Sequence, residues 1–132
     1  MAFIIALQAN NHLYWSLVSQ GGVNYIQASE SVISIRSKFK LKQIDTNTVE
    51  LISDNGLYLS RISRVSGDYI EASKTCPDVY CKFTVEDVGV NKIALRADNK
   101  KYLSLSVQNG INYIKVDKVN VDANCHFKVF LP

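Results

Sequence analysis

Hydrophobic and polar residues alternate along most of the chain, in short runs that turn residues interrupt. The alternation has the period of two that a half-buried strand requires, and it lacks the three-and-four spacing of a helix. In residues 37–41, for example, Phe39 and Leu41 share one face while Lys38 and Lys40 share the other. The pattern predicts an all-β chain of short strands.

The strand pattern recurs every 44 residues with no insertion, so the 132 residues divide into repeats 1–44, 45–88 and 89–132. The residues that match at this interval include Leu7/Leu51/Leu95, Asn11/Asn55/Asn99, Tyr14/Tyr58/Tyr102, Ser16/Ser60/Ser104, Tyr25/Tyr69/Tyr113, Ile26/Ile70/Ile114 and Phe39/Phe83/Phe127. A stacked solenoid needs atypical capping repeats, and the three units leave no residues for them. We therefore expect the units to close into a ring, which removes exposed sheet edges.

Each unit reads as four strands separated by turn residues. In the second unit the first turn is Asp54-Asn55-Gly56, whose Asn-Gly pair tolerates the positive φ angles of a tight hairpin. Second hairpin turns are expected near Gly21-Gly22, Ser66-Gly67 and Asn109-Gly110. Twelve strands in three units predict a β-trefoil with pseudo-threefold symmetry, in a single domain 1–132. We expect the repeated phenylalanines and the leucines Leu7, Leu51 and Leu95 to meet near the threefold axis.

The third strand of each unit offers a candidate binding face. In the first unit Ile26 and Ala28 form an apolar face, which leaves Tyr25, Gln27 and Ser29 on the opposite face, and the other units repeat this arrangement. An aromatic ring beside polar groups suits a sugar, because the ring stacks on the C–H side of a pyranose while polar groups bind the hydroxyls. The alternative is that the three tyrosines only brace the hairpins.

Residues for catalysis or for a cofactor are not evident. The sequence has no phosphate loop, dinucleotide fingerprint, HExxH, nucleophile elbow or CxxC pair. His12 and His126 fall at different positions of the repeat, and the repeated serine Ser16 has no basic neighbour at a fixed spacing. These observations predict a binding protein without catalytic activity, metal or cofactor.

The cysteines and the N-terminal residues bear on location. The three cysteines, an odd number, and the absence of an Asn-x-Ser/Thr sequon favour reduced thiols. Cys81 and Cys125 fall on the core face, and a Cys76–Cys81 disulfide is the alternative. The apolar run of residues 2–7 is too short for a signal peptide or a membrane span. We expect a cytoplasmic or nuclear protein.

Charge is distributed unevenly over the repeats. The net charge of +3 divides into +3, −4 and +4 for the first, second and third units. A mixed-sign surface with this modest net charge does not favour nucleic-acid binding. The contrast provides unlike surfaces for pairing, so we expect a homodimer in which acidic groups such as Asp68, Glu71 or Glu86 approach basic groups of another copy.

The sequence resembles a lectin family. Residues 95–104 (LRADNKKYLS), their second-unit form at residues 51–60 (LISDNGLYLS), and the following Tyr69-Ile70-Glu71-Ala72-Ser73 with Phe83 are similar to the agglutinin domain of amaranthin-type plant lectins. The Asp-Asn-Gly-x-Tyr-Leu element also occurs in fascin-type actin-bundling trefoils, which are the alternative. The galactose-binding ricin trefoil is disfavoured because its Gln-x-Trp signature is missing and Trp15 is the only tryptophan.

The resemblance implies a trefoil lectin for galactose or N-acetylgalactosamine glycans of the T-antigen type, with glycans or glycoproteins as partners. In amaranthin the sugar binds where domains of two subunits meet, so a single domain implies a site between two copies. The family's Tyr-Trp pair is matched here by Asp68-Tyr69, which changes the expected sugar contact. The candidate carbohydrate-binding residues are Asn24, Tyr25, Ser66, Gly67, Asp68, Tyr69, Asn112 and Tyr113.

Overall fold

A computed structural model describes residues 2–132 as twelve strands, with a short 3₁₀ turn between the third and fourth strand of each repeat. The first repeat contains β1 (Ala2–Gln8), β2 (Tyr14–Gln20), β3 (Val23–Glu30), η1 (Ile35–Ser37) and β4 (Phe39–Gln43). The second contains β5 (Thr48–Ile52), β6 (Tyr58–Arg64), β7 (Gly67–Lys74), η2 (Val79–Cys81) and β8 (Phe83–Gly89). The third contains β9 (Lys92–Arg96), β10 (Tyr102–Gln108), β11 (Ile111–Lys118), η3 (Ala123–Cys125) and β12 (Phe127–Phe130).

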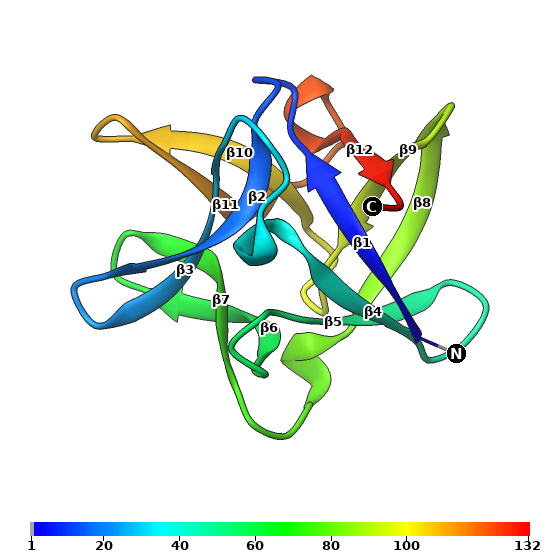
Figure 1. The fold of residues 1–132 in the computed structure, drawn as a ribbon, viewed down its shortest axis with the longest axis horizontal. Helices are drawn as coiled ribbons and strands as arrows, with labels where there is room; N and C mark the ends of the chain where they lie inside the picture. Colours follow the sequence, from blue (N-terminus) through cyan, green and yellow to red (C-terminus); the bar gives the residue numbers. More distant parts are fainter. Residues whose placement is uncertain (1) are drawn as a thin grey trace.

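The first and fourth strands of the repeats close a six-stranded barrel. β1 pairs with β4 and β12, β5 pairs with β4 and β8, and β9 pairs with β8 and β12, all antiparallel. The second and third strands form three hairpins, and β3, β7 and β11 pair with one another at their centre. In Figure 1 the hairpins lie at the left and the barrel strands at the right. This is the predicted β-trefoil.

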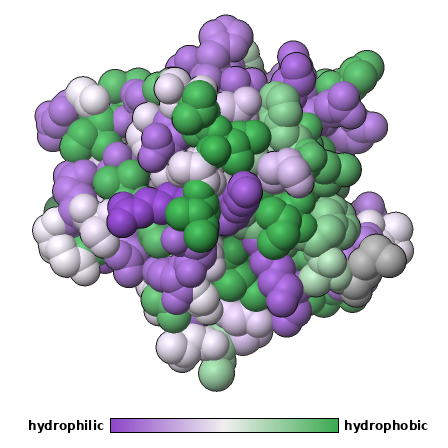
Figure 2. Space-filling view, viewed as in Figure 1, coloured by the Kyte–Doolittle hydropathy of each residue, from purple (hydrophilic) through white to green (hydrophobic). Residues whose placement is uncertain are grey.

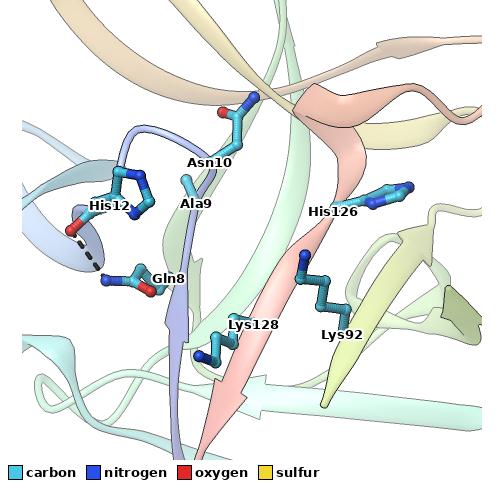
Figure 3. Close-up of a pocket in the computed structure, with 7 residues that line it drawn as sticks. All are labelled: Gln8, Ala9, Asn10, His12, Lys92, His126 and Lys128. Atoms are coloured by element: carbon cyan, nitrogen blue, oxygen red, sulfur yellow. Dashed lines mark hydrogen bonds between the residues drawn. The ribbon is translucent and has the colours of Figure 1, made fainter. Parts of the chain in front are cut away.

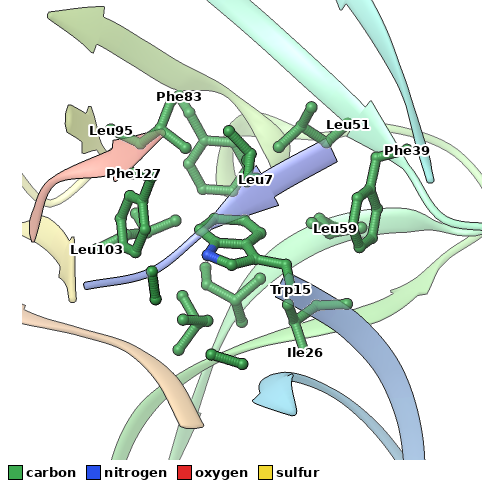
Figure 4. Packing of buried hydrophobic residues seen from close by; sticks show 14 of the residues in the cluster. Leu7, Trp15, Ile26, Phe39, Leu51, Leu59, Phe83, Leu95, Leu103 and Phe127 are labelled. Carbon is green, nitrogen blue, oxygen red and sulfur yellow. The ribbon is translucent and has the colours of Figure 1, made fainter. Parts of the chain in front are cut away.

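The core lies inside the barrel and under the hairpins. The repeated phenylalanines Phe39, Phe83 and Phe127 are completely buried, and the repeated leucines of the first strands surround them (Figure 4). Unit one places Trp15 where the other units have leucine, and its ring meets Phe39 and Phe127 edge-on, with centroid distances of 6.3 and 4.9 Å. The predicted core is confirmed, although its threefold symmetry is broken by one large side chain.

The repeated asparagines form the first turn of every unit. The Asn55 side chain accepts a hydrogen bond from the Leu57 backbone N–H at 3.0 Å, and the other units repeat this contact. The residue between them has a positive φ, which is 81° at Gly56, 67° at His12 and 70° at Lys100. The side-chain bond explains the repeat of asparagine, because it holds the turn even where the following residue is not glycine.

The second hairpin turn of unit two differs from the prediction. The turn residues are Val65 and Ser66, and β7 already begins at Gly67, which has a φ of 129°. The predicted turn Ser66-Gly67 was therefore one residue too late. In the other units both turn residues are glycine or asparagine with positive φ, whereas the unit-two turn places its glycine at the first strand position.

The first tyrosine triad joins each hairpin to the barrel. Each ring contacts the same position of a barrel strand, although the residue there differs from unit to unit: Tyr14 meets Phe130 edge-on, Tyr58 accepts a hydrogen bond from Lys42, and Tyr102 donates to Glu86. The contact to Glu86 raises the pKa of Tyr102, since the hydrogen bond to the carboxylate favours the protonated phenol. The repeated tyrosine thus contacts the barrel through three chemically different interactions.

Several charged groups of the second repeat form ion pairs within the chain. Asp68 pairs with Arg61 and Glu71 with Arg64, so the acidic groups expected to reach another copy are already engaged. Figure 2 shows hydrophobic and hydrophilic side chains interspersed over the face seen in Figure 1. The cysteines are free, with Cys81 and Cys125 buried as expected. Among residues 2–132 no helix is long and apolar enough to cross a membrane.

Candidate functional site

The structure gathers the three candidate tyrosines into one cluster at the threefold axis. Tyr25, Tyr69 and Tyr113 meet with centroid distances of 5.4, 5.1 and 5.1 Å. Tyr69 is only 3% exposed and Tyr113 is 7% exposed. The predicted alternation along the third strand is present, but its second face is covered at the tyrosine and at the position of Gln27, because β3, β7 and β11 converge there, while Ser29 and its equivalents are exposed. The three rings therefore pack against one another, as expected if the tyrosines brace the hairpins.

Two further positions of the repeat complete this cluster. Sequence reasoning placed the third-strand position, that of Gln27, on the same face as the tyrosines and missed the second-strand position, that of Gln20. The end of the second strand and the middle of the third pair within each hairpin: Gln27 donates to Gln20, Arg64 donates twice to Glu71, and Lys115 donates to Gln108. The 44-residue interval places these residues at equivalent positions, yet their types differ, so the interval alone did not mark them. We call these residues and the three tyrosines the axial cap.

Each cap tyrosine also contacts the following repeat. The Tyr69 hydroxyl lies 3.0 Å from the side-chain nitrogen of Gln108, and the Tyr113 hydroxyl accepts from Gln20 at 3.2 Å. The Arg64 guanidinium lies 5.9 Å from the centre of the Tyr25 ring. Burial is the largest cause that raises the pKa of Tyr25, and Arg64 opposes it. The axial cap thus closes the hairpins with packed aromatic rings and a hydrogen-bonded polar pair from each repeat.

The remaining candidate residues do not form a sugar site with the three tyrosines, because their polar groups bind other groups of the chain. Asn24 accepts from Ser19, Asp68 accepts from Ser63, and the Asn112 side chain donates to a backbone carbonyl of β3. Ser66 hydrogen-bonds the Tyr69 hydroxyl, and Gly67 lies against the Lys115 ammonium. Asp68 also accepts a hydrogen bond from Arg61, which lines a different surface feature beside hairpin β6–β7.

This feature is a shallow depression built around Tyr80. The side chain of Asp78 begins η2 by accepting the Tyr80 backbone N–H at 3.0 Å, and Cys81 is buried beneath the turn. The Tyr80 side chain therefore points outward and is 42% exposed. Arg61, Ile62, Ser63 and Lys74 line the depression with it, and the cavity measures about 280 Å³.

Arg61 is the fixed cation of the Tyr80 depression. Its guanidinium donates to both Asp98 oxygens, at 2.8 and 2.9 Å, and to Asp68 at 2.9 Å. The hydrogen bonds lower the pKa of Asp98, because Arg61 stabilises the carboxylate. Arg61 and Lys74 both lie 5.2 Å from the centre of the Tyr80 ring. The depression therefore combines an exposed aromatic ring, two cations and a hydroxyl, and Asp68 accepts hydrogen bonds from two of its lining residues, Arg61 and Ser63.

The Tyr80 depression is specific to the second repeat. At the position of Arg61 the other units have Leu17 and Leu105, and at the position of Tyr80 they have Arg36 and Asn124. An aromatic surface beside fixed hydrogen-bonding groups can hold a polar ring. The residues that the structure describes contain no group of three or more metal-ligating side chains.

The sequence matches no protein-family model and no curated protein. Among solved structures, the chain is similar to the designed threefold-symmetric protein ThreeFoil, with 12% identity and a TM-score of 0.79 over 96% of both chains. It is similar to a mosquitocidal holotoxin, with 15% identity and a TM-score of 0.81, and there it spans 17% of the other chain. It is also similar to the SDF2-like protein from Arabidopsis thaliana, with 12% identity and a TM-score of 0.76, over 98% of this chain and 94% of that one.

These comparisons show the fold alone. Sequence identities this low carry no information on the ligand. A threefold-symmetric trefoil superposes on almost the whole chain, which confirms the repeat architecture read from the sequence. No sequence match supports the amaranthin-type family itself. The choice of ligand therefore depends on the geometry of the surface.

Proposed function

We propose that this protein is a carbohydrate-binding β-trefoil that recognises galactose or N-acetylgalactosamine in glycans and catalyses no reaction. The Tyr80 depression carries the proposal. An exposed tyrosine there lies beside Arg61, which Asp98 and Asp68 hold in place. A pyranose ring stacks its C–H side on the tyrosine, and the guanidinium, Ser63 and Lys74 bind its hydroxyls.

Preorganisation supports this assignment. Arg61 makes three charge-assisted hydrogen bonds before any ligand arrives, so its position costs little conformational entropy on binding. The open, shallow shape suits the end of a glycan more than an enclosed small molecule. The preference for galactose rests on the sequence resemblance to the amaranthin-type agglutinin domain, together with the trefoil fold.

The proposal places the sugar outside the axial cap. Tyr25, Tyr69 and Tyr113 use their ring faces on one another, so a sugar would have to displace aromatic contacts to reach them. One depression in one repeat agrees with the uneven charge of the three units, which predicts fewer than three equivalent sites. The protein therefore holds one such site per chain.

A glycan array followed by calorimetric titration tests the proposal. We expect binding to glycans with terminal galactose or N-acetylgalactosamine, and a loss of about 10-fold or more on Tyr80→Ala, as for aromatic anchors at other interfaces. Arg36→Ala is the matched control, since Arg36 occupies the same position in unit one. Tyr69→Phe should bind as the parent does. Equal losses for Tyr80→Ala and Arg36→Ala would place the site elsewhere.

The fascin-like alternative is distinguished by co-sedimentation with actin filaments. A carbohydrate-binding protein that does not bind actin stays in the supernatant when the filaments are pelleted. An actin-binding trefoil sediments with the filaments. Sedimentation with filaments, together with an empty glycan array, would replace the proposed function with actin binding.

A further inference from the structure

A second surface cavity lies between the first and third repeats, away from the Tyr80 depression. It measures about 260 Å³ and is lined by Gln8, Ala9, Asn10, His12, Lys92, His126 and Lys128. Figure 3 shows Gln8 and His12 on one side, from the end of β1 and its turn, and His126 and Lys92 on the other. We call it the basic groove. The sequence placed the two histidines far apart in the repeat, and the fold brings them to one cavity.

The strand register places the two lysines next to each other. Gln8 in β1 is opposite Lys128 in β12, and Lys128 is opposite Lys92 in β9, so the three side chains form one lateral row. Like charges directly opposite one another in neighbouring strands are destabilising. None of the ion pairs found among residues 2–132 includes Lys92 or Lys128. Lys128 instead lies 5.3 Å from the centre of the Phe130 ring.

The other two repeats show that this row is not demanded by the fold. The equivalent rows are Ile52–Lys40–Ile4 and Arg96–Thr84–Thr48, and each carries a single cation. The position of Asn10 is occupied by Asp54 and Asp98 in the other units. Only the basic groove therefore combines two adjacent lysines with an amide in place of the carboxylate. Each of these differences favours a bound anion.

We propose that the basic groove binds the sulfate ester of a glycan. Lys92 and Lys128 supply the charge that a tetrahedral oxyanion neutralises, and the imidazoles of His12 and His126 supply N–H donors. The amide nitrogens of Gln8 and Asn10 donate to the His12 carbonyl and to Asn124, which orients the two amides, and their oxygens can accept from the hydroxyls of the sugar that carries the sulfate. The volume is below the roughly 300 to 1,000 Å³ of pockets that enclose drug-sized ligands, so it suits one small group.

The same observations argue against a nucleic-acid site. Nucleic acid presents a line of phosphates and requires cations along an extended track. The basic groove holds its two lysines in one row, and the net charge of the chain is only +3. A single confined anion therefore fits better than a polyanion.

Calorimetric titration with galactose 6-sulfate, galactose and sodium sulfate tests the assignment. We expect the sulfated sugar to bind about 10-fold more tightly than galactose at low salt, with the gain reduced by added sodium chloride because exposed charges are screened. Lys92→Gln and Lys128→Gln should each remove most of the gain. Lys40→Gln is the matched control, because Lys40 occupies the position of Lys128 in unit one, and it should keep the gain.

Further outcomes decide between this proposal and its rivals. Tyr80→Ala should keep the sulfate-dependent gain, because the two cavities are lined by different residues, and this result separates the proposal from the proposed function. A loss on Lys40→Gln as large as on Lys128→Gln would overturn the site. Sodium sulfate that competes as well as the sulfated sugar would reduce it to an ion site, and displacement by single-stranded DNA would overturn the glycan assignment.

Thermal unfolding gives a second readout that needs no titration. A ligand that binds the folded state raises Tm, so galactose 6-sulfate should raise the Tm of the parent and of Lys40→Gln more than that of Lys128→Gln. The comparison between variants cancels the general stabilisation that sulfate salts give to any folded protein. An equal rise in Tm for all three proteins would contradict the proposal.

Discussion

Tyr69 and Tyr80 belong to the same repeat, yet their rings have opposite environments. Tyr69 has counterparts in the other two units, is 3% exposed, and packs edge-on against Tyr113. Tyr80 has no aromatic counterpart, is 42% exposed, and contacts two cations. Of these two residues, the tyrosine that recurs every 44 positions closes the structure, and the tyrosine that occurs in one unit alone is exposed at the surface.

The basic groove follows the same rule. Its lysine row and its asparagine are departures from the repeat, whereas the strands that carry them are repeated. A threefold scaffold requires similar packing in each unit, because the three units share one core. Its surface carries no such requirement, so unit-specific residues are where recognition can be added. Each of the following predictions tests this contrast.

The largest effect is expected where repetition and burial coincide, at the phenylalanines of the core. Phe83 is completely buried with its counterparts Phe39 and Phe127. Phe83→Ala should lower the free energy of unfolding by about 3 to 5 kcal/mol, which is a large share of the stability of a domain of this size. Urea denaturation measures the change. A variant that unfolds at the same urea concentration as the parent would contradict the packing described above.

A smaller effect is expected at the ion pair that fixes the Tyr80 depression. Asp98→Asn removes a charge that accepts two hydrogen bonds from the largely buried Arg61, so it should cost about 1 to 3 kcal/mol at neutral pH. Because the pKa of Asp98 is lowered in the folded state, its contribution is present above the unfolded value of about 3.9 and is lost as the pH falls through the folded value. Unfolding titrations at several pH values measure both effects.

The control for this prediction is the equivalent position of unit two. Asp54→Asn changes the equivalent carboxylate of unit two, which makes no ion pair among the described residues, and it should leave stability and its acid dependence unchanged. A parent and an Asp98→Asn protein that lose stability in parallel below about pH 4 would show that the Arg61 pair does not contribute.

A third prediction compares the two tyrosines directly. Tyr69→Phe removes a buried hydroxyl that bonds Ser66 and Gln108, so it should cost about 1 kcal/mol and leave sugar binding unchanged. Tyr80→Phe keeps the exposed ring and should change stability by less than about 0.5 kcal/mol. Urea denaturation and calorimetry on the same two variants give the comparison. A stability loss at Tyr80 larger than that at Tyr69 would reverse the assigned roles.

The fold was predictable because its signals are local and repeated. The alternation around Phe39 and Phe83 gives strands, and Asn55 with Gly56 marks a turn whose hydrogen bond depends on two neighbouring residues. The recurrence then gives the number of units. The shift of the second turn in unit two, by contrast, depends on Gly67 entering the strand, which its sequence neighbours do not reveal.

The surface sites were less predictable because they depend on distance in space. On the third strand the sequence shows two faces and cannot say that the tyrosine on the second face is packed against others, since this contact forms only where the three repeats meet. Arg61 and Asp98 lie in different repeats, and so do His12 and His126. Their proximity follows from the closed barrel and the hairpin arrangement, which residue spacing alone does not determine.

The smallest expected effect concerns assembly. A single weak site gains avidity when two copies present it together, so we predict a homodimer. The sequence suggested that Asp68, Glu71 and Glu86 would orient the copies, but all three contact groups of their own chain. Because these charges are already engaged, we expect the dimer mass to change little between about 0.05 and about 0.5 M salt. Light scattering over a range of protein concentrations measures the mass. A dimer that dissociates at high salt would indicate charged contacts between the two copies, and a monomer under all conditions would contradict the prediction.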